Sequence, residues 1–166
     1  MTSLAIQFEP LSEEHRMPVI DIYNHYIAHS YASFLEQTVS YEFYDIFLAM
    51  MKGYPASAVL AESVIAGFCF LRPYNPIPAF SSAAEITYFI RPEMTRKGLG
   101  HHALAHLIAA AKQRGISHFI ACVSSLNEQG IRFHYKNGFS EQGRLAGIGK
   151  KFNSSFDVIW FQKKIE

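Results

Sequence analysis

Apolar and polar positions along the chain follow two periods, and the changes between them divide it into strands and helices. Segments rich in β-branched and aromatic residues with a short period predict strands; they lie at 4–8, 57–73, 83–92, 117–123, 139–147 and 156–163. The segment 57–73 contains a polar break near Glu62 and Ser63, so we expect it to form a hairpin of two strands.

Four segments carry apolar residues at helical spacing, at 12–30, 41–51, 99–114 and 127–137. Ser12 and Asn127 can cap the first and last of them, and Gly115 provides an end for the longest. The predicted order is β-α-α-β-β-β-α-β-α-β-β, an α/β fold. Such mixing favours a mainly antiparallel sheet with one parallel crossover, from the strand at 84–91 through the long helix to the strand at 117–123.

Length and composition narrow the class of protein. The 166 residues suit one domain, 1–166, that can bury a sizeable core. Lys and Arg number 15 against 14 Asp and Glu, so the overall charge gives no reason to expect nucleic acid or a membrane as a partner. Cys69 and Cys122 both lie in apolar runs, and no apolar run approaches a membrane span. We expect a soluble cytoplasmic protein.

The turn before the long helix can bind an anion. Gly98 and Gly100 permit positive φ and close approach of a ligand, and the first turn of a helix offers free N–H groups. Arg96 and Lys97 add positive charge. The spacing fits neither a P-loop nor a dinucleotide fingerprint. On its own the pattern is equally compatible with a solvated basic turn.

Two histidine pairs at helical spacing raise the possibility of a metal site. His25 with His29, and His102 with His106, could each supply two ligands from one helix face. No cysteine or carboxylate completes either set at a suitable spacing, so we expect no metal.

Several motifs together resemble one protein family. The stretches "EITYFIRPEMTRKGLGHHALAHLI" and "NEQGIRFHYKNGF" resemble the GNAT superfamily of acyl-CoA-dependent N-acetyltransferases. Matches to its phosphinothricin acetyltransferase-like branch are "IYNHYI" at 22–27, "YASF" at 31–34, "RPY" at 72–74 and "GKKFNSSFDVIWFQ" at 149–162. Thr95 departs from the family's Gln or Arg at the start of the glycine turn, and Ser155 from the aromatic residue common in this branch.

The resemblance implies a GNAT fold in which a splayed strand pair, 84–91 and 117–123, holds acetyl-CoA. It implies that the diphosphate lies on the turn Arg96, Lys97, Gly98, Leu99, Gly100 and His101. The pantetheine amides would pair with backbone groups of Tyr88, Phe89 and Ile90. Asn127 would steady the pantetheine arm, although an ordinary helix cap explains it as well.

Acetyl transfer to an amine needs a base, a site that stabilises the oxyanion, and a way to protonate or tolerate the departing thiolate. Glu85 is the candidate general base, with an edge-strand surface glutamate as the alternative. A backbone N–H near Phe89 or Ile90 would stabilise the oxyanion. His134 stands where many superfamily members have a tyrosine, but the phosphinothricin branch also has histidine there; it could protonate the thiolate or orient the acceptor. Tyr135 is a second candidate acid, on a different helix face.

The acceptor is expected to be a small amino acid or analogue. Arg72 can bind a carboxylate with two parallel hydrogen bonds, and Phe34, Tyr74 and Phe152 could line the pocket. The resemblance implies phosphinothricin or methionine sulfoximine as acceptors and a homodimer as the assembly. We therefore expect an N-acetyltransferase that works by direct attack in a ternary complex. The alternatives are an acetyltransferase for another amine or a peptide N-terminus, and a non-catalytic acyl-CoA-binding module.

Overall fold

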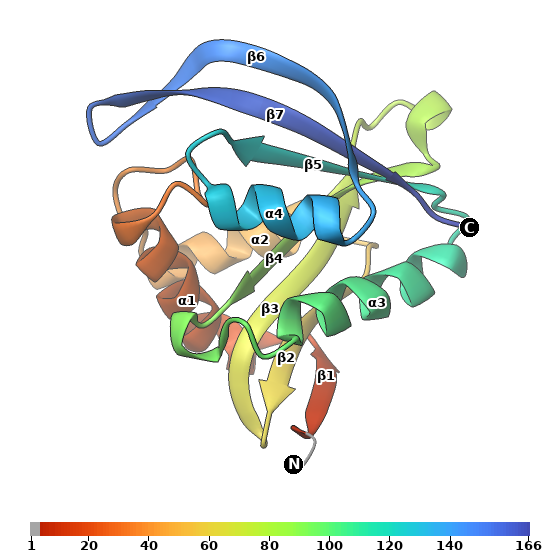
Figure 1. The fold of residues 1–166 in the computed structure, drawn as a ribbon. Coiled ribbons are helices and arrows are strands. Elements are labelled where there is room, and N and C mark those ends of the chain that lie inside the picture. Colours follow the sequence, from red (N-terminus) through yellow and green to blue (C-terminus); the bar gives the residue numbers. More distant parts are fainter. Residues whose placement is uncertain (1–3) are drawn as a thin grey trace.

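A seven-stranded sheet runs through the computed structural model, which describes residues 4–166 (Figure 1). Its strand order is β1-β2-β3-β4-β5-β7-β6. The strands are β1 (Ile6–Pro10), β2 (Ala56–Ala61), β3 (Val64–Pro73), β4 (Ala83–Ile90), β5 (His118–Ser124), β6 (Ser140–Lys151) and β7 (Ser154–Lys164). The predicted order of elements and the mixed α/β class are confirmed.

Helices cover the two faces of this sheet. Helices α1 (Arg16–His29) and α2 (Tyr44–Met50) pack on one face, and α3 (Leu99–Lys112) and α4 (Glu128–Lys136) on the other (Figure 1). Short 3-10 turns, η1 (Glu13–His15), η2 (Tyr41–Phe43), η3 (Pro78–Phe80) and η4 (Pro92–Met94), lie before α1 and α2 and on either side of β4. The functional argument below depends on which face each side chain occupies.

Within residues 4–166, β4 with β5 is the only parallel pair in the sheet, as the sequence predicted. Pairing covers only Ala83–Glu85 against His118–Ile120, although β4 continues to Ile90 and β5 to Ser124. The two strands therefore separate over their second halves. A gap between strands exposes the edge of β4, where backbone groups need other hydrogen-bond partners.

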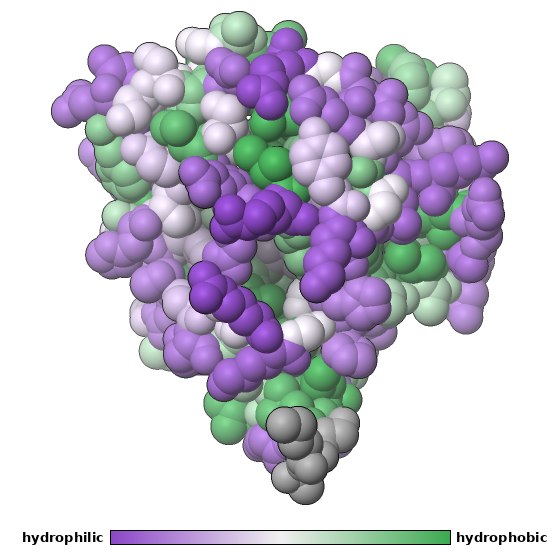
Figure 2. Space-filling model, in the orientation of Figure 1, coloured by the Kyte–Doolittle hydropathy of each residue, from purple (hydrophilic) through white to green (hydrophobic). Residues whose placement is uncertain are grey.

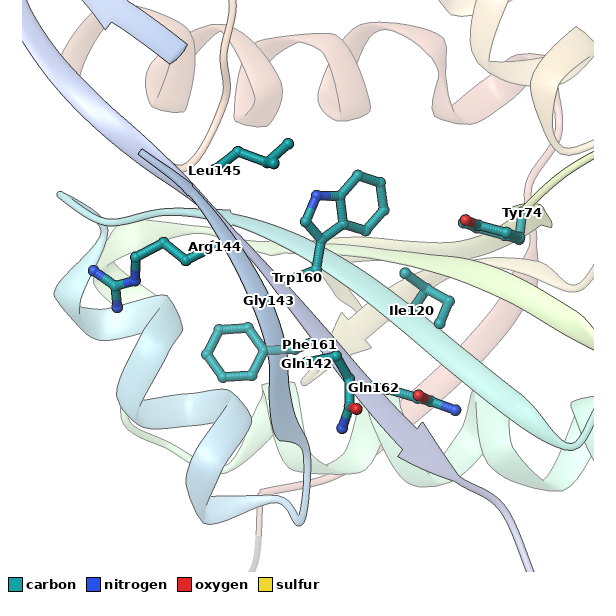
Figure 3. Close-up of a pocket in the computed structure, with 9 residues that line it drawn as sticks. All are labelled: Tyr74, Ile120, Gln142, Gly143, Arg144, Leu145, Trp160, Phe161 and Gln162. Carbon is teal, nitrogen blue, oxygen red and sulfur yellow. The ribbon is translucent and has the colours of Figure 1, made fainter. Parts of the chain in front are cut away.

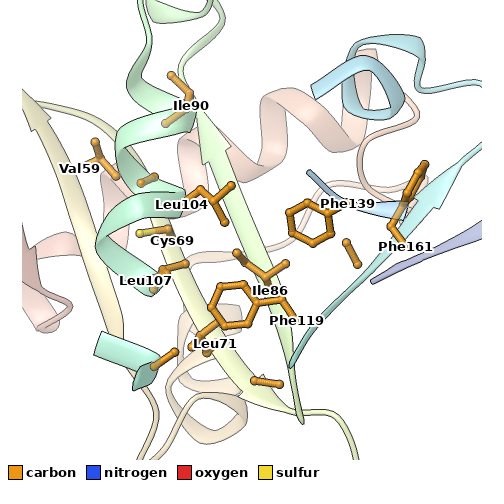
Figure 4. Packing of buried hydrophobic residues seen from close by; sticks show 14 of the residues in the cluster. Val59, Cys69, Leu71, Ile86, Ile90, Leu104, Leu107, Phe119, Phe139 and Phe161 are labelled. Atoms are coloured by element: carbon orange, nitrogen blue, oxygen red, sulfur yellow. The ribbon is translucent and has the colours of Figure 1, made fainter. Parts of the chain in front are cut away.

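Two hydrophobic clusters hold the layers together. The larger lies between α3 and the sheet, where Leu104 and Leu107 pack against Leu71, Ile86 and Phe119 (Figure 4). The smaller joins α1 and α2 to the opposite face through Tyr44, Phe47, Phe68 and Phe70. Successive side chains of β3 and β4 point to opposite faces of the sheet, so the residues along each strand alternate between the two clusters.

The sequence placed some element ends incorrectly. The hairpin at Glu62 and Ser63 is confirmed, and both residues have left-handed φ values of 50° and 65°. Strand β6 extends to Lys151 instead of 147 and continues through a turn at Phe152 and Asn153 into β7, which starts at Ser154 instead of 156. Within residues 4–166, none of the helices combines the length and apolarity needed to cross a bilayer.

Candidate active site

Arg72 and Glu85 form an ion pair on the face of the sheet that α1 covers. They are register partners on β3 and β4, and the Arg72 Nη2 to Glu85 Oε1 distance is 2.5 Å. The Glu85 side chain is 19% exposed and the Arg72 side chain 34%. Arg72 Nε is buried and has no hydrogen-bond partner among residues 4–166. The pair thus keeps one buried donor available beside a carboxylate.

The charges of Arg72 and Glu85 affect the pKa values of two neighbouring side chains. Burial, followed by the negative charge of Glu85, raises the pKa of the Cys122 thiol to about 11. Burial also raises the pKa of Tyr23, against the opposing charge of Arg72. Cys122 comes from β5 and Tyr23 from α1, so the ion pair faces a space bounded by the splayed strand and the first helix.

His134 lies on the opposite face, in a buried site between α4 and the splayed strands. Its Nδ1 is 2.6 Å from the carbonyl oxygen of Gly130, and its Nε2 is 2.5 Å from the hydroxyl oxygen of Tyr88. A carbonyl oxygen only accepts hydrogen bonds, so Nδ1 carries the proton and Nε2 accepts from Tyr88. The ring also stacks on Phe161 of β7. His134 therefore links α4 to both β4 and β7.

Burial sets the protonation state of this pair. It lowers the pKa of His134 to about 4, and the bond to Gly130 offsets that effect only in part. The pKa of Tyr88 is raised by burial well above its ordinary value. At neutral pH both groups are uncharged, and both ring nitrogens of His134 are already in use. A charged imidazolium is thus not the resting form of this residue.

The edge of β4 presents alternate backbone groups to the gap. Tyr74 N donates to Ala83 O and Arg91 N donates to Ala66 O, so the odd-numbered residues of β4 face β3. The even-numbered Ile86, Tyr88 and Ile90 consequently direct their backbone groups toward β5. The expectation for Phe89 needs correction, because its backbone faces β3 and its side chain packs on Tyr23 and Tyr26.

The glycine turn has the geometry of an anion site, but its two glycines serve different purposes. Gly98 is the N-cap of α3 with φ 85°, and Arg96 also lies in the left-handed region at φ 62°. Gly100 lies inside α3 without a positive φ, which corrects the sequence-based expectation. A Cβ there would stand 3.0 Å from the Phe133 ring, so Gly100 allows α4 to pack against α3.

Hydrophilic side chains surround this region of the surface. Figure 2 shows them around a hollow in the middle of the face formed by α3 and α4, with hydrophobic residues visible inside it. Arg96 and Lys97 are exposed. The N–H groups of Leu99, Gly100 and His101 have no partner within the helix, because they belong to its first turn. Thr95 Oγ1 donates to Pro92 O and closes η4.

Asn127 caps α4, as predicted, because its side-chain oxygen accepts from Gly130 N at 3.0 Å. The other polar groups near the helix ends have local partners. His101 Nδ1 is 2.8 Å from Asn137 Oδ1, and the exposed Tyr135 hydroxyl donates to Glu141. Tyr135 and His134 both contact the Phe161 ring, but the hydroxyl of Tyr135 is bound at the surface and not in the buried site of His134.

The four residues expected to line an acceptor pocket fall into two groups. Phe34 stacks on Phe156, and Phe152 lies in the β6–β7 turn against Tyr31. Tyr74 follows Arg72 at the end of β3 and meets the edge of Trp160. Sequence reasoning missed Trp160, because an aromatic residue in a strand is ordinarily a core residue.

Lys151 fixes the first of these groups in place. Its ammonium group donates to Ser30 O and Ser33 O at 2.6 and 2.8 Å, and the residue is 1% exposed. Phe152 N donates to the carboxylate of Glu36. The loop after α1 is therefore attached to the β6–β7 turn by polar bonds that its sequence did not indicate.

The two histidine pairs considered as metal ligands lie in different environments. His106 stacks on Phe8 at 4.1 Å between ring centroids and lies 3.0 Å from Ser57 Oγ. His25 and His29 are exposed and their rings are 5.0 Å apart. In the part of the chain that the structure describes, no group of three or more potential ligands could hold a metal ion.

Comparisons with known proteins agree with this geometry. The chain is 28% identical over 165 residues to phosphinothricin N-acetyltransferase from Streptomyces coelicolor, covering 96% of each chain. It is 26% identical over 152 residues to L-methionine sulfoximine/L-methionine sulfone acetyltransferase from Salmonella typhimurium, covering 89% of this chain and 88% of the relative.

The fold likewise matches that of a solved structure. A Salmonella typhimurium protein determined with acetyl-CoA superposes with a TM-score of 0.88 at 24% identity, over 98% of this chain and 95% of that one. The model of the acetyltransferase (GNAT) family matches residues 19–139. With the splayed strand pair and the glycine turn described above, this match shows that the chain belongs to the GNAT family of acetyltransferases.

Proposed function

We propose that the protein transfers the acetyl group of acetyl-CoA to the primary amine of a small amino acid or a close analogue, of the phosphinothricin or methionine sulfoximine type. One observation carries the choice of acceptor. Arg72 and Glu85 place a positive and a negative charge side by side, with Arg72 Nε buried and unpaired within residues 4–166. A zwitterion presents the complementary pair of charges. Its carboxylate can bind Arg72 while its ammonium group approaches Glu85.

The residues of the turn fit acetyl-CoA. The diphosphate would lie on Arg96, Lys97, Gly98, Leu99, Gly100 and His101, where Gly98 at φ 85° starts a helix. The backbone groups of Tyr88 would pair with the pantetheine amides, and Asn127 would steady that arm. The Ile90 carbonyl is bound by the Tyr26 hydroxyl, which leaves the Ile90 N–H for the oxyanion. The observation that supports this placement is the early end of β4–β5 pairing.

The transfer follows from these positions. Glu85 takes a proton from the ammonium group, and the free amine attacks the thioester carbon. The N–H of Ile90 donates to the oxyanion, the attacking nitrogen loses its second proton to solvent, and the carbon–sulfur bond breaks to give the amide and a thiolate. Solvent returns a proton to the thiolate and removes the one on Glu85. His134, neutral and bonded at both nitrogens, positions Tyr88 at the gap instead of supplying that proton.

A panel of acceptors tests this function. Purified protein is incubated with acetyl-CoA and amino acids, their decarboxylated amines or a tripeptide, and both CoA release and product mass are followed. We expect turnover with amino acids, a much higher KM for amines without a carboxylate, and loss of turnover in Glu85→Gln with acetyl-CoA binding retained.

Three measurements separate the alternatives. Arg72→Met should raise the KM for amino acids far more than the KM for a decarboxylated amine, because only the amino acid has a carboxylate that binds Arg72. Faster turnover of the tripeptide than of any amino acid would indicate an N-terminal acetyltransferase. Acetyl-CoA binding without turnover of any amine would indicate a non-catalytic acyl-CoA-binding module.

We also propose that residues 1–166 act as one domain and assemble as a cytoplasmic homodimer. The two cysteines are free, which suits a reducing compartment. Ile77 and Phe80 before β4, and Ile148 on β6, are exposed apolar residues of the kind that subunit contacts bury. Light scattering of the purified protein tests the assembly, and a monomer at micromolar concentration would contradict it.

A further inference from the structure

The free edge of β4 ends at a hydrogen bond that comes from a side chain instead of a strand. The hydroxyl of Tyr26, on α1, donates to the carbonyl oxygen of Ile90 at 2.5 Å, although the two residues are 64 positions apart in the sequence. Ile90 directs its backbone groups into the gap between β4 and β5, so this carbonyl would accept from β5 if the two strands stayed together. Tyr26 thus takes the place of a strand donor at this end of the gap.

Strand β5 is not in a position to make this bond. All of β5 is paired with β7 on its other edge, and its pairing with β4 stops at Ile120. Figure 3 shows this part of the sheet, where Ile120 of β5 and Trp160 of β7 line one groove. The gap is therefore built into the sheet by the β5–β7 pairing, and the bond from Tyr26 belongs to it.

The peptide group between Ile90 and Arg91 is held at both ends. Its carbonyl oxygen accepts from Tyr26, and its N–H group, which belongs to Arg91, donates to Ala66 O at 2.7 Å. One bond comes from α1 and the other from β3, so the group cannot rotate without breaking one of them. The N–H of Ile90 is attached to the same Cα and therefore has little freedom of direction.

The phenol ring of Tyr26 is itself fixed by packing. Its centroid lies 5.1 Å from that of Phe89, which packs in turn on Tyr23 and Phe68. Burial raises the pKa of Tyr26 to about 12, so the hydroxyl keeps its proton well above neutral pH. The donor at this end of the gap is thus constant in position and in protonation.

We infer, building on the proposed function, that Tyr26 is a positioning residue for acetyl transfer. With the gap side of the Ile90 carbonyl occupied by the hydroxyl, a ligand pairs with Ile90 through the N–H group alone, and the thioester oxygen is what accepts from it. Tyr26 therefore sets how far the pantetheine arm follows β4 and holds the thioester carbon where Glu85 delivers the amine. The hydroxyl acts through the Ile90 peptide and not on the reacting atoms.

Tyr26→Phe keeps the ring, removes the hydroxyl and tests this role. We expect kcat to fall about tenfold or more, because a thioester misplaced by about 1 Å reacts up to about a hundredfold more slowly. The affinity for CoA, measured by calorimetry, should stay within about twofold of the parent value, since the diphosphate is expected on the glycine turn. Acetyl-CoA should lose affinity severalfold relative to CoA, because its acetyl oxygen is the group that accepts from Ile90 N–H.

Tyr44→Phe is the matched control. Tyr44 on α2 is also a buried tyrosine whose hydroxyl donates to a backbone carbonyl, Ser12 O at 2.8 Å, and burial raises its pKa to about 12 as well. Both variants should lose similar stability in urea unfolding, and only Tyr26→Phe should change kcat and the ratio of the two affinities. Equal kcat values in the two variants would overturn the proposal. So would a loss of CoA and acetyl-CoA affinity by the same factor, because Tyr26 would then support the wall of the cofactor site and not the acetyl group.

Two of these measurements need no turnover and separate this proposal from the proposed function. A parent protein that acetylates no amine would overturn the proposed function, while the ratio of CoA to acetyl-CoA affinity would still decide whether Tyr26 places the acetyl group. Hydrogen exchange at the Arg91 amide tests the clamp in the free protein, and it should be faster in Tyr26→Phe than in Tyr44→Phe. Equal exchange rates would show that the peptide is held without Tyr26 and would overturn the proposal.

Discussion

The hydroxyl of Tyr88 and Nε2 of His134 lie 2.5 Å apart and join the edge strand of the gap to the helix that covers it. Tyr88 lies on β4 and His134 on α4, and the two residues are 46 positions apart in the sequence. Because Nδ1 of the same ring donates to Gly130 O, Nε2 of the neutral imidazole accepts from the Tyr88 hydroxyl.

Protonation of His134 should destabilise the fold below about pH 6.5. Its pKa is about 4 in the folded protein and about 6.5 when unfolded, so the unfolded chain binds more protons between these values. Stability therefore rises with pH across that window, by about 3 kcal/mol for this residue alone. Urea unfolding at several pH values should show this dependence, and His134→Gln should flatten it.

His102→Gln serves as the control for that series, because His102 is exposed on α3. Its pH dependence should match that of the parent protein. An equal slope in His134→Gln and the parent would show that His134 is not held neutral.

Removal of the Tyr88 hydroxyl should weaken both stability and acetyl-CoA binding. In Tyr88→Phe the buried Nε2 of His134 loses its donor, at a cost of about 1–3 kcal/mol in the free energy of unfolding. Acetyl-CoA affinity, measured by calorimetry, should fall severalfold because α4 is no longer tied to β4. Tyr135→Phe removes an exposed hydroxyl bonded to Glu141 and should change neither quantity appreciably.

Gly98→Val should weaken acetyl-CoA binding more than it weakens the fold. A β-branched residue is strained at φ 85°, and its side chain stands where the diphosphate is expected. Gly53→Val is the matched control, since Gly53 has φ 80°, open space around it and a position in the turn after α2. Both variants should lose similar stability, of about 1–2 kcal/mol, and only Gly98→Val should lose affinity. Equal affinities would contradict the anion site.

Lys151→Met should raise the KM for the acceptor. The substitution keeps most of the side-chain volume but leaves the carbonyl groups of Ser30 and Ser33 without their donor. The loop that carries Phe34 would then lose its attachment to the β6–β7 turn, with a stability loss of about 1–3 kcal/mol. Lys150→Met changes the exposed neighbour and should be neutral. Steady-state kinetics on both variants, with the KM for acetyl-CoA as internal reference, checks this.

The sequence predicted the order of elements well because each depends on local patterns. The strand at Ala83–Ile90 and the helix from Leu99 have strong periodicity, and Asn127 forms the cap its residue type favours. Strand β6 was predicted too short because Gly147 and Gly149 interrupt its pattern. Its length is set by pairing with β7, which is a tertiary effect.

The sequence indicates candidate residues for the site but not the contacts between them. Glu85 and Arg72 were each assigned a role, yet their contact depends on the register between β3 and β4 across an irregular connection. Likewise, nothing near Gly100 in the sequence indicates that Phe133 is what excludes a side chain there. Contacts of this kind are fixed by packing, which a local pattern does not contain.

The early separation of β4 from β5 also provides a direct way to observe ligand occupancy. The amide protons of Tyr88 and Ile90 face an open edge, so in the free protein they should exchange with solvent faster than those of Thr87 and Phe89, which face β3. An extended ligand that carries its own amides can enter the gap in the manner of an added strand. Slower hydrogen exchange at the amides of Tyr88 and Ile90 would then show that a bound ligand occupies the place of a neighbouring strand.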